Sequence, residues 1–340
     1  MAGLKELRTR IESIKSTQKI TSAMKMVAAS KFRRAQLTLE KSELFQKMMI
    51  GNIKNVLVSL KQEAAEKGVS YMLPKMLVQP KNPKVYALFV LASDRGLCGS
   101  YNSQIAKEAK RRIDELHKEG KQTVVFCYGK KGLSGLKRLG VTEIEGSYPN
   151  VIKKHLTYEE AMSFLHDVWN KKEQYGADIC EIVYSDFLSG LSRTLVSKQV
   201  IPFDIATAPE DESLNRVGDA FYGYLPDKLG LLQKLSRVYM RTAMFEILIN
   251  SQASEHAARM SSMDNANRNA RDMISSLTFK YNSLRQSAIT TELTEIVAGA
   301  EAMKQENVAG QRRCNSEQSA FMRRNIRSKK RDGGKKEKRS

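Results

Sequence analysis

Apolar residues near the start of the chain repeat with helical spacing over a stretch that lacks helix breakers. Residues 4–50 contain neither Gly nor Pro. The first apolar positions have the 3-4-3 spacing of a coiled-coil seam, at Leu4, Leu7, Ile11 and Ile14. The stripe then continues in a shifted register, as a stutter produces, through Ile20, Met24 and Val27. The pattern predicts an N-terminal helix about 70 Å long, at a rise of about 1.5 Å per residue.

A second stretch without Gly or Pro covers residues 231–298 and predicts a helix of about 100 Å near the other end of the chain. It begins with closely spaced apolar residues and becomes small and polar between Ser251 and Arg271. A single helix of this length has no surface on which to bury its apolar stripe. We therefore expect the two terminal helices to pair as an antiparallel coiled coil.

Between these helices the apolar pattern changes to short runs that alternate with helical segments. The runs at 85–92, 123–128, 178–184 and 192–201 predict strands, and the stretches at 102–118, after Gly129 and at 158–173 predict helices. This alternation predicts an α/β domain with a parallel or mixed sheet. We expect a helix over 1–60, the α/β domain over 75–210, the long helix over 227–303 and a separate tail over 304–340.

The chain is strongly basic, with 57 Lys and Arg against 37 Asp and Glu and a formal net charge of +20. An excess of positive charge indicates an acidic partner, which is a nucleic acid, an anionic lipid surface or an acidic protein surface. The tail over 304–340 carries 13 basic and 4 acidic residues, and we expect it to be disordered. The longest apolar runs are far shorter than the roughly 20 residues of a membrane span.

Few residues point to catalysis. The four cysteines lie far apart without a CxxC motif, which predicts free thiols in a reducing compartment. The segment 93–100 (SDRGLCGS) follows a predicted strand and precedes a predicted helix, where Gly-rich turns bind phosphate. Its spacing matches neither GxGxxG nor GxxxxGK[ST], which favours a tight turn over a nucleotide site. The four histidines form no metal-binding pattern, so we expect no catalytic residue, cofactor or metal.

Four segments of the chain resemble the gamma subunits of F-type (proton-translocating) ATP synthases. Two of them lie in the predicted terminal helices, at 18–31 (QKITSAMKMVAASK) and 289–300 (ITTELTEIVAGA). The other two are 93–99 (SDRGLCG) and 253–260 (ASEHAARM). Because all four occur in the family's order over residues 1–303, the chain is identified as a member of this family.

The resemblance implies an antiparallel coiled coil of the N- and C-terminal helices with a central Rossmann-like α/β domain. It implies that one copy per complex forms the central rotor stalk inside a hexameric ring of alpha and beta subunits. The α/β domain would lie against the epsilon subunit and the c-ring. Rotation would couple proton flow to ATP synthesis at the beta-subunit sites, so the chain itself is non-catalytic and binds no cofactor. Its membrane association would be peripheral and indirect, on the cytoplasmic side of a bacterial inner membrane.

The resemblance also assigns residues to surfaces. Contacts with the alpha/beta ring are implied for Met24, Lys25, Arg259, Gln286, Thr290 and Glu292. An apolar tip that turns in a collar at the top of the ring is implied for Ile296, Val297, Ala298 and Met303. Charge and helical position add Arg8 and Arg33 as further candidates, and the segment 222–226 is a candidate contact with the c-ring or epsilon.

Two features depart from the family's pattern. Family members end close to Met303, whereas this chain continues for the 37 residues 304–340. The chain also lacks a Cys-bearing insert of the chloroplast kind, which predicts that thiols do not control it. Because the family-like pattern begins directly at Met1, we expect a bacterial protein rather than an imported organellar precursor.

Two other classes of function stay open from the residues. A nucleic-acid-binding coiled-coil protein would use the tail and the basic stretch from Lys25 to Arg34 and would show a steep salt dependence. Phe32 is the only aromatic residue in that stretch, which weakens this interpretation. A Rossmann-type enzyme is the second alternative, and it predicts that the isolated chain binds a nucleotide.

Overall fold

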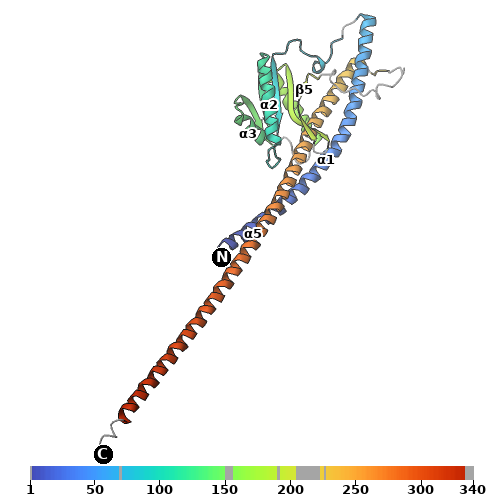
Figure 1. The fold of residues 1–340 in the computed structure, drawn as a ribbon. Helices are drawn as coiled ribbons and strands as arrows, with labels where there is room; N and C mark the ends of the chain where they lie inside the picture. Colours follow the sequence, from blue (N-terminus) through green and yellow to red (C-terminus); the bar gives the residue numbers. More distant parts are fainter. Residues whose placement is uncertain are drawn as a thin grey trace, which may run out of the picture. The chain divides into compact units, whose positions relative to one another are not determined.

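The computed structural model contains two long helices and a five-stranded sheet with shorter helices around it (Figure 1). It describes residues 2–68, 71–149, 156–189, 192–203, 223–225 and 227–333. Helix α1 covers Ala2–Lys67 and helix α5 covers Lys228–Gly333. The chain divides into two compact units. One consists of Met1–Ser16 with Ala270–Ser340, and the other is Thr17–Asn269.

The sheet in the second unit has the strand order β3-β2-β1-β4-β5. Its strands are β1 (Val85–Leu91), β2 (Gln122–Tyr128), β3 (Ile144–Tyr148), β4 (Ile179–Ser189) and β5 (Ser192–Ile201). The first four in this order are parallel, and β5 runs antiparallel to β4. Parallel strands require crossover connections, which α2 (Tyr101–Lys118), α3 (Lys130–Arg138) and α4 (Tyr158–Gln174) supply. A short 3-10 helix, η1 (Lys75–Leu77), precedes the sheet.

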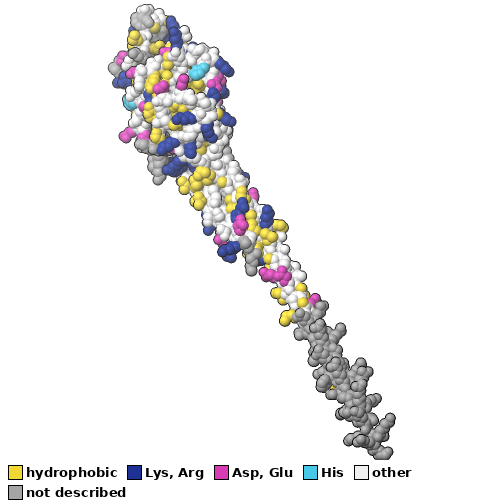
Figure 2. Space-filling view, turned by 90° about the vertical axis from the view of Figure 1, so that its left-hand side faces the viewer, with side chains coloured by type: hydrophobic (Ala, Val, Ile, Leu, Met, Phe, Trp, Pro, Cys, Tyr) yellow, Lys and Arg dark blue, Asp and Glu magenta, His cyan; other side chains and the backbone are white. Residues whose placement is uncertain are grey.

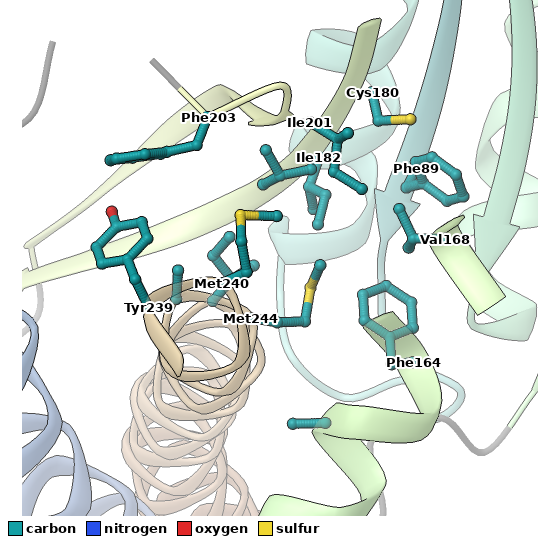
Figure 3. Packing of buried hydrophobic residues seen from close by; sticks show 14 of the residues in the cluster. Phe89, Phe164, Val168, Cys180, Ile182, Ile201, Phe203, Tyr239, Met240 and Met244 are labelled. Atoms are coloured by element: carbon teal, nitrogen blue, oxygen red, sulfur yellow. The ribbon is translucent and has the colours of Figure 1, made fainter. Parts of the chain in front are cut away.

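Helices cover both faces of this sheet, which explains why its central strands are apolar on both sides. Alternate residues of β1 face opposite ways: Phe89 lies in one buried cluster and Leu88 in the other. The cluster around Leu88 includes buried residues of α2 and α3. The cluster around Phe89 includes α4 and the start of α5, where Met240 and Met244 point toward the strands (Figure 3). Helix α5 is therefore part of the core of the α/β domain.

Within the second unit, α1 and α5 lie side by side and run antiparallel (Figure 1). Lys25 of α1 pairs with Asp264 of α5, with Nζ and Oδ1 2.6 Å apart. Near the other end of this section, Lys228 of α5 pairs with Glu63 of α1 at 2.8 Å. The two pairs lie at opposite ends of one antiparallel arrangement, and between them Ala35 of α1 and Ala253 of α5 belong to one buried cluster.

The expected fold class is confirmed, and the strands and helices lie close to their predicted ranges. Strand β3 was not predicted, because Ile144 is its only aliphatic residue and Gly146 lies in its middle. The structure also differs from the expected disorder of the tail, since α5 continues as a helix over residues 304–333. Good helix formers such as Lys, Arg, Gln, Glu and Ala dominate this stretch, and extending an existing helix needs no new nucleus. Residues 334–340 lie outside the described part.

Candidate functional site

The N-terminal contact candidates lie on the part of α1 that pairs with α5. Met24 is half-buried, whereas the neighbouring Met26 and Val27 are exposed. The Lys25 side chain is 45% exposed although it forms the ion pair with Asp264. Its ammonium is thus held in a fixed place but stays open to solvent. Sequence reasoning missed Asp264, because nothing in its local sequence marks it as the partner of a residue in the other helix.

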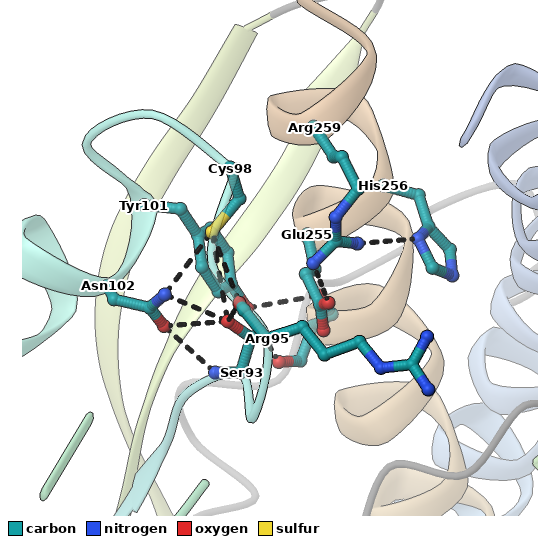
Figure 4. A network of polar contacts seen from close by, with 9 residues as sticks. Ser93, Arg95, Cys98, Tyr101, Asn102, Glu255, His256 and Arg259 are labelled. Carbon is teal, nitrogen blue, oxygen red and sulfur yellow. Dashed lines mark hydrogen bonds and ion pairs between the residues drawn. The ribbon is translucent and has the colours of Figure 1, made fainter. Parts of the chain in front are cut away.

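Arg259 lies in a polar cluster within α5, and its side chain is only 12% exposed (Figure 4). Its Nη2 donates to Glu255 Oε1 at 2.6 Å, and its Nη1 lies 3.3 Å from Nδ1 of His256. Burial, with the charges of Arg259 and Lys31, lowers the pKa of His256 to about 4. His256 is therefore neutral near pH 7 and accepts from the guanidinium, which is directed into its own helix.

The polar groups of the turn 93–100 bond to one another and to Asn102 at the start of α2 (Figure 4). The Ser93 N–H donates to Asn102 Oδ1 at 2.9 Å, and its hydroxyl donates to the carbonyl of Arg95 at 2.7 Å. Gly99 has a φ of +59°, and a β-carbon there would lie 3.7 Å from that of Ser262 on α5. The glycine lets the turn adopt a left-handed conformation close to the helix. The turn therefore serves to seat the α/β domain on α5.

Leu97 has a positive φ of 64° and an exposed side chain within this same turn. A branched residue rarely adopts this conformation, which costs about 1–3 kcal/mol. The turn thus keeps an apolar side chain on the surface in a strained backbone, and sequence reasoning gave no sign of it.

The second set of candidates lies in the first unit, on the distal part of α5. Gln286, Thr290 and Glu292 are exposed, and the Thr290 hydroxyl donates to the carbonyl of Gln286 at 2.9 Å. The tip candidates Ile296, Val297 and Met303 are 67%, 58% and 68% exposed, and Ala298 is exposed too. Exposed apolar residues grouped along a helix are typical of a contact surface rather than of a core.

The remaining candidates are less informative. Arg8 pairs with Glu12 at 3.6 Å in an exposed position, and Arg33 is exposed. Of the segment 222–226, Tyr222 and Pro226 lie outside the described residues, and Leu225 is exposed. Within the described part of the chain, no cluster of His, Cys, Asp or Glu could hold a metal ion.

Basic and acidic side chains are intermixed on the face of the α/β domain seen in Figure 2. Helix α2 alone holds the pairs Arg111–Glu115 and Lys110–Asp114. Nucleic-acid interfaces gather basic residues on one face, and this face lacks that distribution. Among the described helices, none has the length and apolarity that crossing a membrane requires.

Comparison with known proteins identifies the family. The model of the ATP-synt family, described as ATP synthase, matches residues 3–303. The ATP synthase gamma chain of Paramagnetospirillum magneticum is 40% identical over 305 residues, which cover 89% of this chain and all of that relative. The ATP synthase gamma chain of Rhodospirillum rubrum is 39% identical over 309 residues, with the same coverage. These names give no support to a nucleic-acid-binding protein or a Rossmann-type enzyme.

Solved structures of ATP synthases contain chains that are similar to this one. The central stalk and c-ring structure of the Tetrahymena thermophila mitochondrial ATP synthase contains a chain that is 27% identical, with a TM-score of 0.50, over 73% of this chain and 99% of that one. A chain of the Euglena gracilis mitochondrial ATP synthase has a TM-score of 0.57 and 18% identity, over 89% of this chain and 95% of that one, which shows the shared fold. From the family match and the relatives, the chain belongs to the ATP synthase gamma chains.

Proposed function

We propose that this chain is the central rotor stalk of an ATP synthase and couples proton flow to ATP synthesis by rotating inside the alpha/beta ring. The observation that carries the proposal is the antiparallel pair of α1 and α5, with ion pairs at Lys25–Asp264 and Glu63–Lys228. The α/β domain packs on the same helix α5, so a force applied to that domain reaches the helical pair through a shared core.

The mechanism follows from asymmetry. One stalk inside a ring of three identical beta sites must contact each of them differently. It biases their nucleotide affinities only through the difference in contact free energy that each site experiences at a given angle. Turning the stalk then moves every site through binding, synthesis and release, while the chemistry stays in beta.

Met24, Lys25 and Arg259 are the proposed ring contacts on the Thr17–Asn269 unit. The half-exposed ammonium of Lys25 suits an acidic loop, because it can exchange Asp264 for another carboxylate at little cost in a solvated setting. Arg259 is less accessible, so its contact would use the N–H groups of the guanidinium that Glu255 and His256 leave open.

Gln286, Thr290 and Glu292 are the proposed ring contacts on the distal part of α5. Ile296, Val297 and Met303 are proposed as the tip that turns in an apolar collar, and their exposure supports this. An apolar surface without directional hydrogen bonds can slide, since the hydrophobic effect does not depend on orientation. Epsilon and the c-ring are the further proposed partners, at one copy of this chain per complex, on the cytoplasmic side of a bacterial inner membrane.

Reconstitution tests this function. Alpha and beta subunits are assembled with and without the chain, and ATPase turnover is measured. We expect turnover to require the chain and to fall severalfold for Lys25→Glu. Lys107→Glu makes the same charge change on the exposed face of α2 and serves as the control. Equal turnover with and without the chain would contradict the proposal.

A further inference from the structure

A short section of α5 is joined to the α/β domain by polar side chains. Asn250 Oδ1 accepts a hydrogen bond from the backbone N–H of Phe187 at 2.6 Å, and its Nδ2 donates to Asp186 Oδ1. Both partners lie on β4, next to an irregularity in the pairing of β4 with β5. One side chain of α5 thus binds β4 through two hydrogen bonds. We call Glu246, Asn250, Asp186 and Phe187 the α5–β4 joint.

The next residue of α5 binds the other side of the domain. The hydroxyl of Tyr101, the first residue of α2, lies 3.1 Å from both the carbonyl and the Oγ of Ser251. Tyr101 is fully buried, so this bond is shielded from water. Asn250 and Ser251 therefore connect α5 to two different elements of the α/β domain within one helical turn.

Glu246 lies one turn before Asn250 on α5, and its carboxyl is partly buried beside the joint. Its Oε2 is shielded from solvent and has no hydrogen-bond partner. Charged and titratable groups face it from every element packed around it. They are Asp186 and Tyr184 on β4, Lys198 on β5, Glu43 and Lys47 on α1, and Tyr239 on α5.

We propose that Asn250 and Glu246 are positioning residues for rotary coupling: Asn250 fixes α5 to β4, and the protonation state of Glu246 sets how firmly this joint holds. The inference rests on the proposed function. In a rotor, the α/β domain and the helical pair must turn together. Relative movement between them would let one turn without the other. The joint adds polar, directional contacts to the apolar core that α5 shares with the domain.

The sign of the pH effect follows from burial. Burial disfavours the charged form of a carboxyl, and it raises the pKa of Glu246 to about 7. Burial also raises the pKa of Asp186, against the opposing effect of Lys198 and the Asn250 hydrogen bond. When Glu246 loses its proton, a second negative charge enters the joint close to Asp186. The contact between α5 and β4 at this joint is therefore stable below about pH 7 and is weakened above it.

The test uses inverted membrane vesicles that contain the complete ATP synthase. Proton pumping, followed by quenching of a pH-sensitive dye, is divided by the rate of ATP hydrolysis at pH 6 and at pH 8. With a pKa of about 7, the charged fraction of Glu246 rises from about 0.1 to about 0.9 between these values. We expect the wild-type coupling ratio to fall over this range and Glu246→Gln to keep its pH 6 value throughout.

Three further variants separate the possible outcomes. Asn250→Ala should lower the ratio at both pH values. Lys198→Met removes an opposing positive charge, so the fall should shift to higher pH. Asp272→Asn makes the matched carboxyl-to-amide change at an exposed position of α5 and should follow the wild type.

The inference is overturned if Glu246→Gln shows the wild-type pH profile, or if Lys198→Met leaves its midpoint unchanged. Either result concerns vesicles that still assemble and pump. Failure of the proposed function differs, because pumping and hydrolysis would then not depend on the chain at all.

Discussion

The ion pair between Arg112 of α2 and Glu181 of β4 tests how the α/β domain is held together. Nε and Nη2 of Arg112 donate to the two carboxylate oxygens at 2.8 and 2.6 Å, and Ser197 of β5 donates to Oε2 at 2.7 Å. The Glu181 side chain is only 6% exposed. One carboxylate thus connects a covering helix to two strands, in a place that little water reaches.

Arg112→Met keeps most of the apolar stem and removes both guanidinium donors. Each hydrogen bond to a charged group contributes about 1.5–3 kcal/mol. Removing one partner of a buried ion pair costs about 3–5 kcal/mol, since the remaining charge is left without compensation. We expect the free energy of unfolding to fall by about 4 kcal/mol. That is a large share of the roughly 5–15 kcal/mol by which a domain is stable.

Urea unfolding of the purified chain, followed by the fluorescence of its single tryptophan, Trp169 on α4, measures this loss. The matched control is Arg112→Met combined with Glu181→Met, which removes the buried charge as well. We expect the double variant to regain most of the stability. A loss below about 1 kcal/mol for Arg112→Met would refute the reasoning. So would a double variant as unstable as the single one, which would assign the loss to packing.

Three other predictions follow from the same structure. The pKa of Glu246 is raised from 4.5 to about 7 in the folded chain, so Glu246 binds its proton more tightly when the chain is folded. The contribution of Glu246 to stability is therefore fully present below pH 4.5 and is lost as pH rises through about 7. Glu246→Gln should therefore raise the thermal midpoint at pH 8 and not at pH 5, and equal shifts would contradict this. Gly129→Ala should cost about 3 kcal/mol in urea unfolding, since φ is +106° and a β-carbon would lie 2.2 Å from a carbonyl oxygen. At Gly120, where φ is +70° and space is open, the same change should cost about 1 kcal/mol. Lys25→Ala breaks a partly exposed pair with Asp264, so stability should change by about 1 kcal/mol or less while ATP synthesis falls severalfold; parallel losses would argue against a ring contact.

Much of the architecture was readable from the chain because its signals are local. Long stretches without Gly or Pro and a helical apolar period predicted α1 and α5, and short segments rich in apolar residues predicted β1, β2, β4 and β5. The four family-like segments, including 93–99 and 253–260, were sufficient to identify the family. Each of these depends on residues that are neighbours in sequence, where spacing alone decides which face of an element is apolar.

What the sequence could not determine depends on residues brought together over long distances. Lys25 and Asp264 are separated by 239 positions, and Asn250 meets Phe187 across 63, so no local pattern marks either contact. Strand β3 forms because β2 offers a parallel edge, although its own residues are poor strand formers. The burial of Glu246 and the inward direction of Arg259 likewise arise only when the helices and sheet pack. Sequence periodicity sets which residues are apolar or charged, whereas tertiary packing sets which charges lose their water and which partners they find.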